Sequence, residues 1–281
     1  MLVGERPSRC TGITAAICFL MLGGCVSSPS FQFDEFANAH GFDRLIREGR
    51  GFSHLLLTAG WDRRQLKRLH VYLDGDGTPW LGPGRPAGDP TPHNPLVLRL
   101  AALDPNPILY LGRPCYAGFS ASPECHPWYW THGRYSRSVV DSLSDVLRRV
   151  IREKSVEEVV LIGFSGGGTL AMLMADQIPQ VRTVVTLAAN LDILRWATLH
   201  GYSQLAGSLN PADLPALPPR IEQWHWVGEL DRNVPPGLVK DGLARQHLGI
   251  RVRVLPGVDH RCCWEGRWLE MLREMDLTPT S

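Results

Sequence analysis

Ser165 lies in the pentapeptide Gly163-Phe164-Ser165-Gly166-Gly167, which has the pattern GxSxG. Four apolar residues precede the pentapeptide, and a helix-like segment follows from Thr169. This context predicts that Ser165 occupies a sharp turn from a buried strand to a helix, where flanking glycines tolerate a strained backbone. The turn would hold the serine hydroxyl out at a sheet edge, where it could attack an acyl carbon. A simple Gly-rich turn is the alternative, whereas a phosphate-binding loop is disfavoured because no lysine follows and GxGxxG spacing is absent.

A serine hydroxyl is a weak nucleophile that needs a base, and the base needs an acid to orient it. His260 follows the last predicted strand and precedes a helix, which favours it as the base. Asp231 ends the preceding strand and is the preferred acid, because its strand would neighbour the strand that leads to His260. Asp192 follows another strand and is the rival, whereas Asp259 is too close to His260 in sequence to reach its Nδ1 easily.

Seven apolar runs are predicted to form the strands that position these side chains. They span 54–60, 68–77, 107–114, 156–167, 181–190, 221–231 and 250–260. Helical spacing predicts helices over 95–103, 137–153, 167–178, 236–248 and 265–275. The alternation predicts an α/β fold with a doubly wound, mostly parallel sheet and helices on both faces. Residues 74–95 and 192–219 break the pattern and are either surface connections or loops that shape a substrate pocket.

The order Ser165, Asp231, His260 at successive strand ends resembles the α/β-hydrolase superfamily over most of residues 50–275. The segments "VYLDGDG", "YLGRPC" and "CHPWYWTHGRYS" resemble bacterial lipoprotein-type α/β hydrolases. This resemblance implies the α/β-hydrolase fold and a catalytic triad in which Ser165 attacks, His260 moves the proton and Asp231 orients His260.

Gly166 follows the proposed nucleophile at a helix N-terminus, where its N–H is placed to stabilise an oxyanion. The resemblance implies a second donor from the loop Asp74-Gly75-Asp76-Gly77, and the Asp76 N–H is the first choice. Many lipases have His-Gly-Gly-Gly there, so the two carboxylates are a departure. They would oppose a negative charge unless they are paired or turned away. Alternatively, these aspartates only form the turn by bonding to backbone N–H groups.

The N-terminal residues 1–24 are predicted to be an export signal, because basic residues precede an apolar run that is too short to span a bilayer. Leu22-Gly23-Gly24-Cys25 resembles a bacterial lipobox, which implies a lipid on Cys25 and a membrane anchor. The residues after Cys25 lack an inner-membrane retention aspartate, which favours the periplasmic side of the outer membrane. The predicted organisation is a signal peptide over 1–24, a lipidated linker over 25–50 and a hydrolase domain over 51–281. An ordinary secretory signal is the alternative.

Export also bears on the cysteines, because oxidising compartments favour disulfides. The simplest pairing joins Cys115 to Cys125, while Cys262 and Cys263 could bridge to each other, cross to that loop or stay reduced. Neither CxxC nor HxxxH spacing accompanies them, so no metal is predicted. Loss of residues 1–24 removes two of 29 basic and one of 28 acidic residues and leaves a formally neutral chain. No basic surface therefore favours a nucleic-acid partner.

These features together predict an exported, lipid-anchored serine hydrolase that cleaves an ester-type acyl bond in a small-molecule substrate without a cofactor. An acyltransferase or a peptidase with the same triad is the alternative within this chemistry. A non-catalytic envelope protein on a hydrolase scaffold is the alternative from another class. The motifs specify neither the acyl group nor the oligomeric state.

Overall fold

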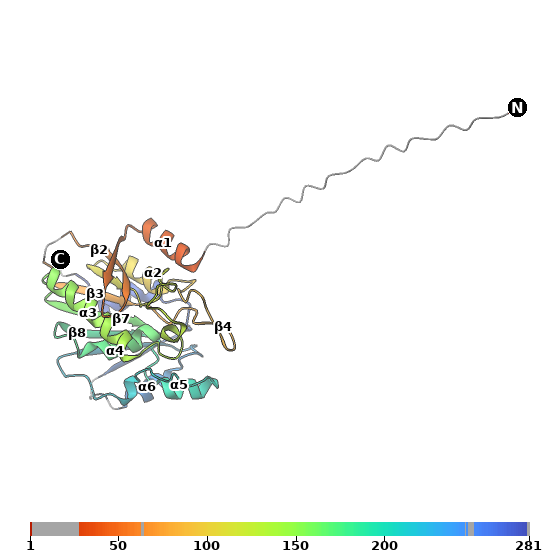
Figure 1. The fold of residues 1–281 in the computed structure, drawn as a ribbon. Helices are drawn as coiled ribbons and strands as arrows, with labels where there is room; N and C mark the ends of the chain where they lie inside the picture. Colours follow the sequence, from red (N-terminus) through yellow and green to blue (C-terminus); the bar gives the residue numbers. More distant parts are fainter. Residues whose placement is uncertain (2–27, 63–64, 245, 247–249, 280–281) are drawn as a thin grey trace.

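The computed structural model describes residues 1, 28–62, 65–244, 246 and 250–279, and an eight-stranded sheet lies at its centre (Figure 1). The spatial order is β1-β2-β6-β3-β7-β8-β9-β10. The six strands β6, β3, β7, β8, β9 and β10 are parallel to one another. At the other edge, β2 pairs antiparallel with both β6 and β1. The strands are β1 (Asp43–Glu48), β2 (Ser53–Ala59), β3 (Arg68–Leu73), β6 (Ile108–Leu111), β7 (Glu158–Phe164), β8 (Val181–Leu187), β9 (Glu222–Gly228) and β10 (Arg251–Leu255).

All seven predicted strands are present, as β2, β3 and β6 to β10. The five predicted helices are also present, and they are α2 (Leu96–Leu103), α3 (Arg137–Glu153), α4 (Gly166–Ala175), α6 (Pro236–Gly242) and α7 (Glu265–Glu274). The continuous apolar runs became strands because both faces of the sheet are covered, and the five central residues of β7 are all buried. The predicted α/β class and the mostly parallel sheet are therefore confirmed.

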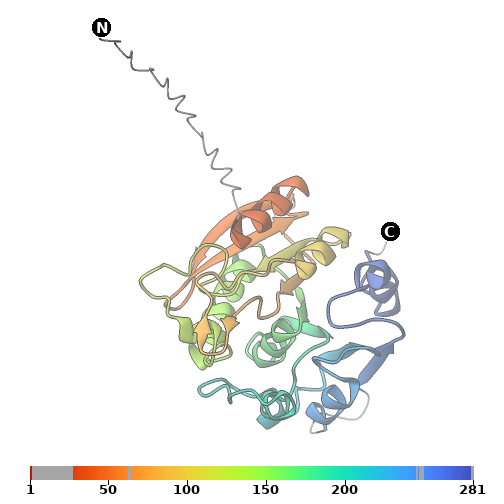
Figure 2. The ribbon, with the colours of Figure 1, turned by 90° about the vertical axis from the view of Figure 1, so that its right-hand side faces the viewer.

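Two hydrophobic layers cover the sheet, one on each face. Buried side chains of α3, α4 and α6 pack with one set of strand residues, and those of α1 (Pro29–Ala39), α2 and α7 pack with the other. Strand β3 shows the division, because Val71 and Leu73 face the first layer while Tyr72 faces the second. Figure 2 shows α1, α2 and α7 along one side of the sheet and α4 along the other.

The segment 25–50, expected to be a linker, is folded from residue 29 to residue 48. Helix α1 buries Phe33 in the core, and β1 pairs with β2 from Asp43 to Glu48. The strand was missed because its sequence, DRLIRE, is charged, as an exposed edge strand that faces solvent often is. The folded domain thus begins before residue 51.

The irregular stretches contain short elements that the sequence indicated weakly or not at all. Residues 74–95 include a hairpin of β4 (Trp80–Gly82) and β5 (Arg85–Pro86), and residues 192–219 include α5 (Ile193–His200) and a 3₁₀ turn at Pro211–Asp213. Another 3₁₀ turn spans Pro127–Trp130.

The predicted pairing of Cys115 with Cys125 is present as a disulfide, and Cys262 is joined to Cys263. The predicted export signal and Cys25 lie outside the described residues. In the part of the chain that the structure describes, no helix is both long and apolar enough to cross a membrane, and no group of three His, Cys, Asp or Glu side chains could hold a metal ion.

Candidate active site

Ser165 lies between the end of β7 and the start of α4, as predicted. Its backbone has φ 50° and ψ −120°, a conformation that a residue with a side chain adopts only at a cost in strain. Its N–H donates to the carbonyl of Leu187 on the neighbouring strand, at 2.8 Å. A Cβ on Gly163 would overlap the backbone of Gly167, and one on Gly167 would overlap the carbonyl of Leu73. The flanking glycines therefore make room for the strained turn.

His260 and Asp231 lie together at the ends of two neighbouring strands. Strand β9 pairs in parallel with β10, so the loops that follow these strands emerge at the same sheet edge. The Nδ1 atom of His260 is 2.8 Å from Oδ2 of Asp231, whose side chain is fully buried. The other oxygen, Oδ1, accepts the backbone N–H groups of Asn233 and Val234 at 2.9 and 2.7 Å. These bonds fix the carboxylate, which in turn fixes the orientation of the imidazole.

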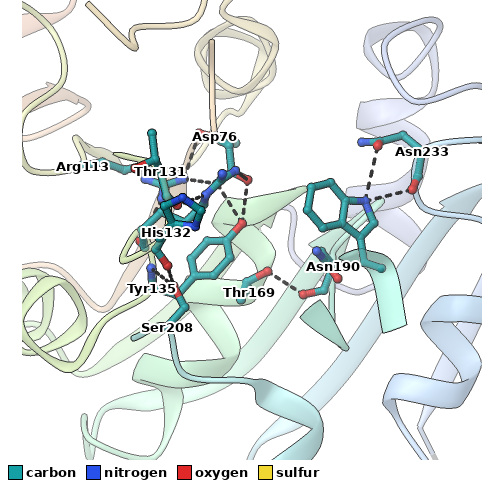
Figure 3. A network of polar contacts seen from close by, with 12 residues as sticks. Asp76, Arg113, Thr131, His132, Tyr135, Thr169, Asn190, Ser208 and Asn233 are labelled. Carbon is teal, nitrogen blue, oxygen red and sulfur yellow. Dashed lines mark hydrogen bonds and ion pairs between the residues drawn. The ribbon is translucent and has the colours of Figure 1, made fainter. Parts of the chain in front are cut away.

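Asn233 is a neighbour of His260 that the sequence analysis did not identify. Its Nδ2 is 3.0 Å from Nε2 of His260. Its backbone carbonyl accepts the indole N–H of Trp196 at 3.1 Å (Figure 3). With the amide nitrogen donating, Nε2 carries a lone pair and Nδ1–H donates to Asp231. This is the tautomer that a general base requires. Asn233 belongs to no sequence motif. Its position two residues after Asp231 is the one feature of the sequence that could have indicated it.

Ser165, His260 and Asn233 line one cavity of about 1100 Å³. Within the described residues no hydrogen bond joins the Ser165 hydroxyl to the His260 ring, whose Nε2 bonds to Asn233 instead. The structure thus links two members of the predicted triad directly and brings the third to the same cavity.

The two other aspartates considered as acids have local roles. Asp192 caps the start of α5, where its Oδ1 accepts the N–H of Arg195 at 3.1 Å. Asp259 is exposed and accepts the N–H groups of Arg261 and Cys262, both at 2.7 Å. Neither carboxylate bonds to His260 in the described structure.

Asp76, expected to supply an oxyanion N–H, has its carboxylate in a buried charge cluster (Figure 3). Arg113 Nη1 donates to Oδ1 at 2.7 Å and Arg134 Nη1 to Oδ2 at 2.9 Å, and the two guanidinium side chains are only 2% and 4% exposed. The Tyr135 hydroxyl donates to the same carboxylate at 2.7 Å. Burial alone would raise the pKa of Asp76, but the charges of Arg134 and Arg113 outweigh it and lower the pKa to about 2.

This cluster packs directly against the turn that carries Ser165. A Cβ on Gly166 would overlap Oδ1 of Asp76 and would lie 2.5 Å from the Tyr135 hydroxyl. The carboxylate is therefore close to the predicted oxyanion position, but two guanidinium groups pair with it. The "DGDG" departure is thus compatible with a site that accommodates a negative charge.

Asp74, the first acid of that loop, is buried, and among the described residues it has no cationic hydrogen-bond partner. It accepts the N–H of Gly75 at 2.8 Å and the Tyr110 hydroxyl at 3.1 Å. Burial raises the pKa of the Asp74 carboxyl to about 6, although both of these hydrogen bonds act in the opposite direction. The bond to Gly75 is the turn-forming role that the sequence also allowed for this loop.

Comparison with known proteins agrees with the fold described above. The model of the family described as alpha/beta hydrolase fold matches residues 116–216. A serine hydrolase without a lid from Xanthomonas campestris is 15% identical, with a TM-score of 0.55, over 85% of this chain and 96% of that one. An esterase from Pyrococcus furiosus is 10% identical, with a TM-score of 0.56, over 84% and 92%. The protein has the α/β-hydrolase fold. No curated protein matches it in sequence.

A third similar structure is described neither as an esterase nor as a serine hydrolase. It is a proline iminopeptidase-related protein from Thermus thermophilus, 14% identical with a TM-score of 0.57, over 84% of this chain and 97% of that one. An α/β-hydrolase fold supports a hydrolase as the coarse function of the chain. The fold alone does not select the bond that is cleaved, so the bond must be argued from the site.

In this α/β-hydrolase fold the cavity walls come from the irregular stretches. Trp80 in the hairpin and Trp196 and Tyr202 at α5 line the cavity. In segment 126–136, Trp130 is buried outside the cavity, whereas His132 and Arg134 line it. One polar wall group is unsatisfied, because Asn190 is buried and its Oδ1 has no hydrogen-bond partner in the described structure. The cavity therefore combines a few aromatic residues with many polar and charged ones, among them Asp76, Arg134 and Arg261.

Proposed function

We propose that the protein is a serine hydrolase that cleaves an ester-type acyl bond through Ser165, His260 and Asp231. The observation that carries the proposal is the 2.8 Å bond between His260 and the buried Asp231 at the cavity that the strained Ser165 also lines. A nucleophile on a strained turn and a base oriented by a buried acid are the components that acyl transfer needs.

In the proposed reaction Ser165 Oγ attacks the acyl carbon while His260 Nε2 takes the serine proton. Asn233 now bonds to that nitrogen, so its amide must give way when the proton moves. Asp231 stays ionised and stabilises the imidazolium, which then protonates the leaving oxygen as the ester C–O bond breaks. Water attacks the acyl-enzyme by the same route, and His260 returns the proton to Ser165 as the acid is released.

The tetrahedral oxyanion would bind at the start of α4. Gly166 is the first residue of that helix, so its N–H has no partner within the helix and lies at the positive end of the helix dipole. The backbone N–H of Asp76 is the proposed second donor. Arg113 and Arg134 support this role because they pair with the Asp76 carboxylate and reduce its repulsion of an anion.

The aromatic residues of the cavity, Trp80, Trp196 and Tyr202, favour acyl or aryl groups of medium size, because aromatic side chains bind such groups by apolar contact. We also propose that the domain acts at the cell envelope through a lipid on Cys25, on the periplasmic side of the outer membrane. The lipobox sequence supports that location.

Hydrolysis of p-nitrophenyl butyrate by the purified protein tests the proposal. We expect Ser165→Ala to lower kcat by roughly 10³-fold or more. The matched control is Ser203→Ala, because Ser203 also lines the cavity but is not on the strained turn. Wild-type protein without activity above buffer would support a non-catalytic scaffold instead. Butyryl transfer to an added alcohol that exceeds hydrolysis would assign the site to an acyltransferase.

A further inference from the structure

The described chain starts beside the proposed active site. Ser30, in the first turn of α1, donates its hydroxyl to Asp89 and lies 3.4 Å from the hydroxyl of Thr91. The loop continues from Thr91 into Pro92 and His93, which line the cavity. Figure 1 shows the start of α1 and the β4 hairpin on the same side of the molecule. The N-terminal end of the folded domain therefore lies on the cavity side.

The proposed lipid anchor would hold this side close to a membrane. Only three residue steps separate Cys25 from Ser28, which caps α1 through its hydroxyl and the N–H of Phe31. Because an extended chain spans at most about 3.6 Å per residue, Ser28 would lie within roughly 11 Å of a lipidated Cys25. So short a connection would keep the start of α1, and with it the loop of Thr91 that Ser30 contacts, close to the bilayer.

Four large, exposed apolar residues lie at the start of the folded domain or close to the cavity in sequence. Phe31 is 54% exposed, Leu81 at the hairpin 54%, Leu199 on α5 58% and Tyr202 55%. Leu81 lies between Trp80 and Gly82, which line the cavity, and Leu199 is on the helix that contributes Trp196. A single exposed apolar residue is ordinary in a soluble protein. Here four of them lie at the tether or around one cavity, which is the distribution that an interfacial surface requires.

We infer that this face docks on the lipid bilayer and that the substrate is an acyl ester of a membrane lipid. The inference rests on the proposed hydrolase function. The lipid acyl carbon would bond to Ser165 Oγ as its ester C–O bond breaks, and the lipid alcohol would leave with the proton from His260. Water would then release the fatty acid. The cavity of about 1100 Å³ slightly exceeds the usual size of ligand sites, roughly 300–1,000 Å³, so it has room for an acyl chain longer than the medium-sized groups that its aromatic residues favour.

The test uses the full-length lipidated protein and two substrates, p-nitrophenyl acetate in solution and a fluorogenic phospholipid in phosphatidylcholine vesicles. The variant is Leu81→Gln with Leu199→Gln, since neither leucine lines the cavity. The control is Leu103→Gln with Leu269→Gln, two exposed leucines on α2 and α7. We expect the first pair to reduce vesicle hydrolysis at least tenfold and to leave acetate hydrolysis within twofold. The control should match wild type on both substrates.

The outcomes separate the two proposals. Equal vesicle hydrolysis by the Leu81/Leu199 variant and wild type would overturn the docking surface while leaving the hydrolase intact. A wild-type enzyme that cleaves the acetate but not the vesicle lipid would overturn the lipid substrate. A protein that cleaves neither and does not react with a fluorophosphonate would overturn the proposed function itself. An additional Cys25→Ala variant should lose at least tenfold in vesicle hydrolysis, and an unchanged rate would contradict the role of the anchor.

Discussion

Replacing Asp76 by Asn should destabilise the fold strongly, because it leaves two buried guanidinium groups without their counter-charge. The carboxylate bonds to Arg113 and Arg134 at 2.7 and 2.9 Å, and both arginine side chains are almost completely buried. Removing one partner of a buried charge pair costs about 3–5 kcal/mol. Although burial acts in the opposite direction, the same two arginines lower the pKa of Asp76 to about 2, against an ordinary 3.8, which corresponds to roughly 2 kcal/mol in favour of the ionised form in the folded state.

The assay is urea denaturation at pH 7, which lies above both the folded and the ordinary pKa of Asp76, so its full contribution is present. We expect the free energy of unfolding to fall by about 3–5 kcal/mol, out of the 5–15 kcal/mol typical of a domain. The matched control is Glu158→Gln. Glu158 pairs with Arg68 at 3.4 Å, and both side chains are more than one-third exposed. Loss of such a surface pair should cost less than about 1 kcal/mol.

The two variants test whether the cluster of Asp76, Arg113 and Arg134 stabilises the fold or contributes no more than a surface ion pair. A decrease for Asp76→Asn no larger than that for Glu158→Gln would refute the argument that burial makes this cluster structurally important. Because the cluster packs against Gly166, we also expect the remaining folded Asp76→Asn protein to have a lower kcat on p-nitrophenyl butyrate than the Glu158→Gln control.

Three further predictions concern the turn, a buried histidine and the disulfide. Gly166→Ala should cost about 1–3 kcal/mol in urea denaturation through overlap with the charge cluster, whereas Gly266→Ala, with open space around it, should leave the fold intact. Burial lowers the pKa of the His225 imidazole to about 3, so between pH 6.5 and 3 this histidine is protonated only in the unfolded chain. Lowering the pH from 7 to 5 should therefore reduce the unfolding free energy of wild type by about 2 kcal/mol more than that of His225→Gln. An equal reduction in the two proteins would contradict this. Replacing Cys115 and Cys125 by serine opens a loop of sequence separation 10 and should cost about 3 kcal/mol by thermal denaturation, with an unchanged Tm as the contrary result.

Strands and helices were predicted best where burial in the core alone determined the residue pattern. The strands β7, β8 and β9 are buried on both faces and therefore have continuous apolar runs, which a sequence pattern reveals. Strand β1 is largely exposed, and no pattern marked it, because most of its residues are charged; of its two apolar residues, Leu45 packs against the core and Ile46 is exposed. The same logic applies to the site. The positions of Asp231 and His260 followed from the order of strands in a parallel sheet.

The partners of these residues could not be predicted in the same way. Asp76 meets Arg113 and Arg134 from segments 37 and 58 residues away, and no local pattern encodes such contacts. Asn233 approaches His260 only because β9 and β10 are neighbours and their loops meet at one edge. Local sequence thus indicated the reactive residues, while the groups that orient and neutralise them depend on tertiary structure.

The central claim is that Ser165 is the nucleophile, and covalent labelling tests it most directly. The full-length protein is treated with a fluorophosphonate probe, digested, and the modified residue is located by mass spectrometry. We expect one adduct on the peptide that contains Ser165, and its loss in the Ser165→Ala variant, while the Ser203→Ala variant is labelled as strongly as wild type. Absence of labelling in folded wild-type protein, or an adduct on another serine that persists in Ser165→Ala, would contradict it.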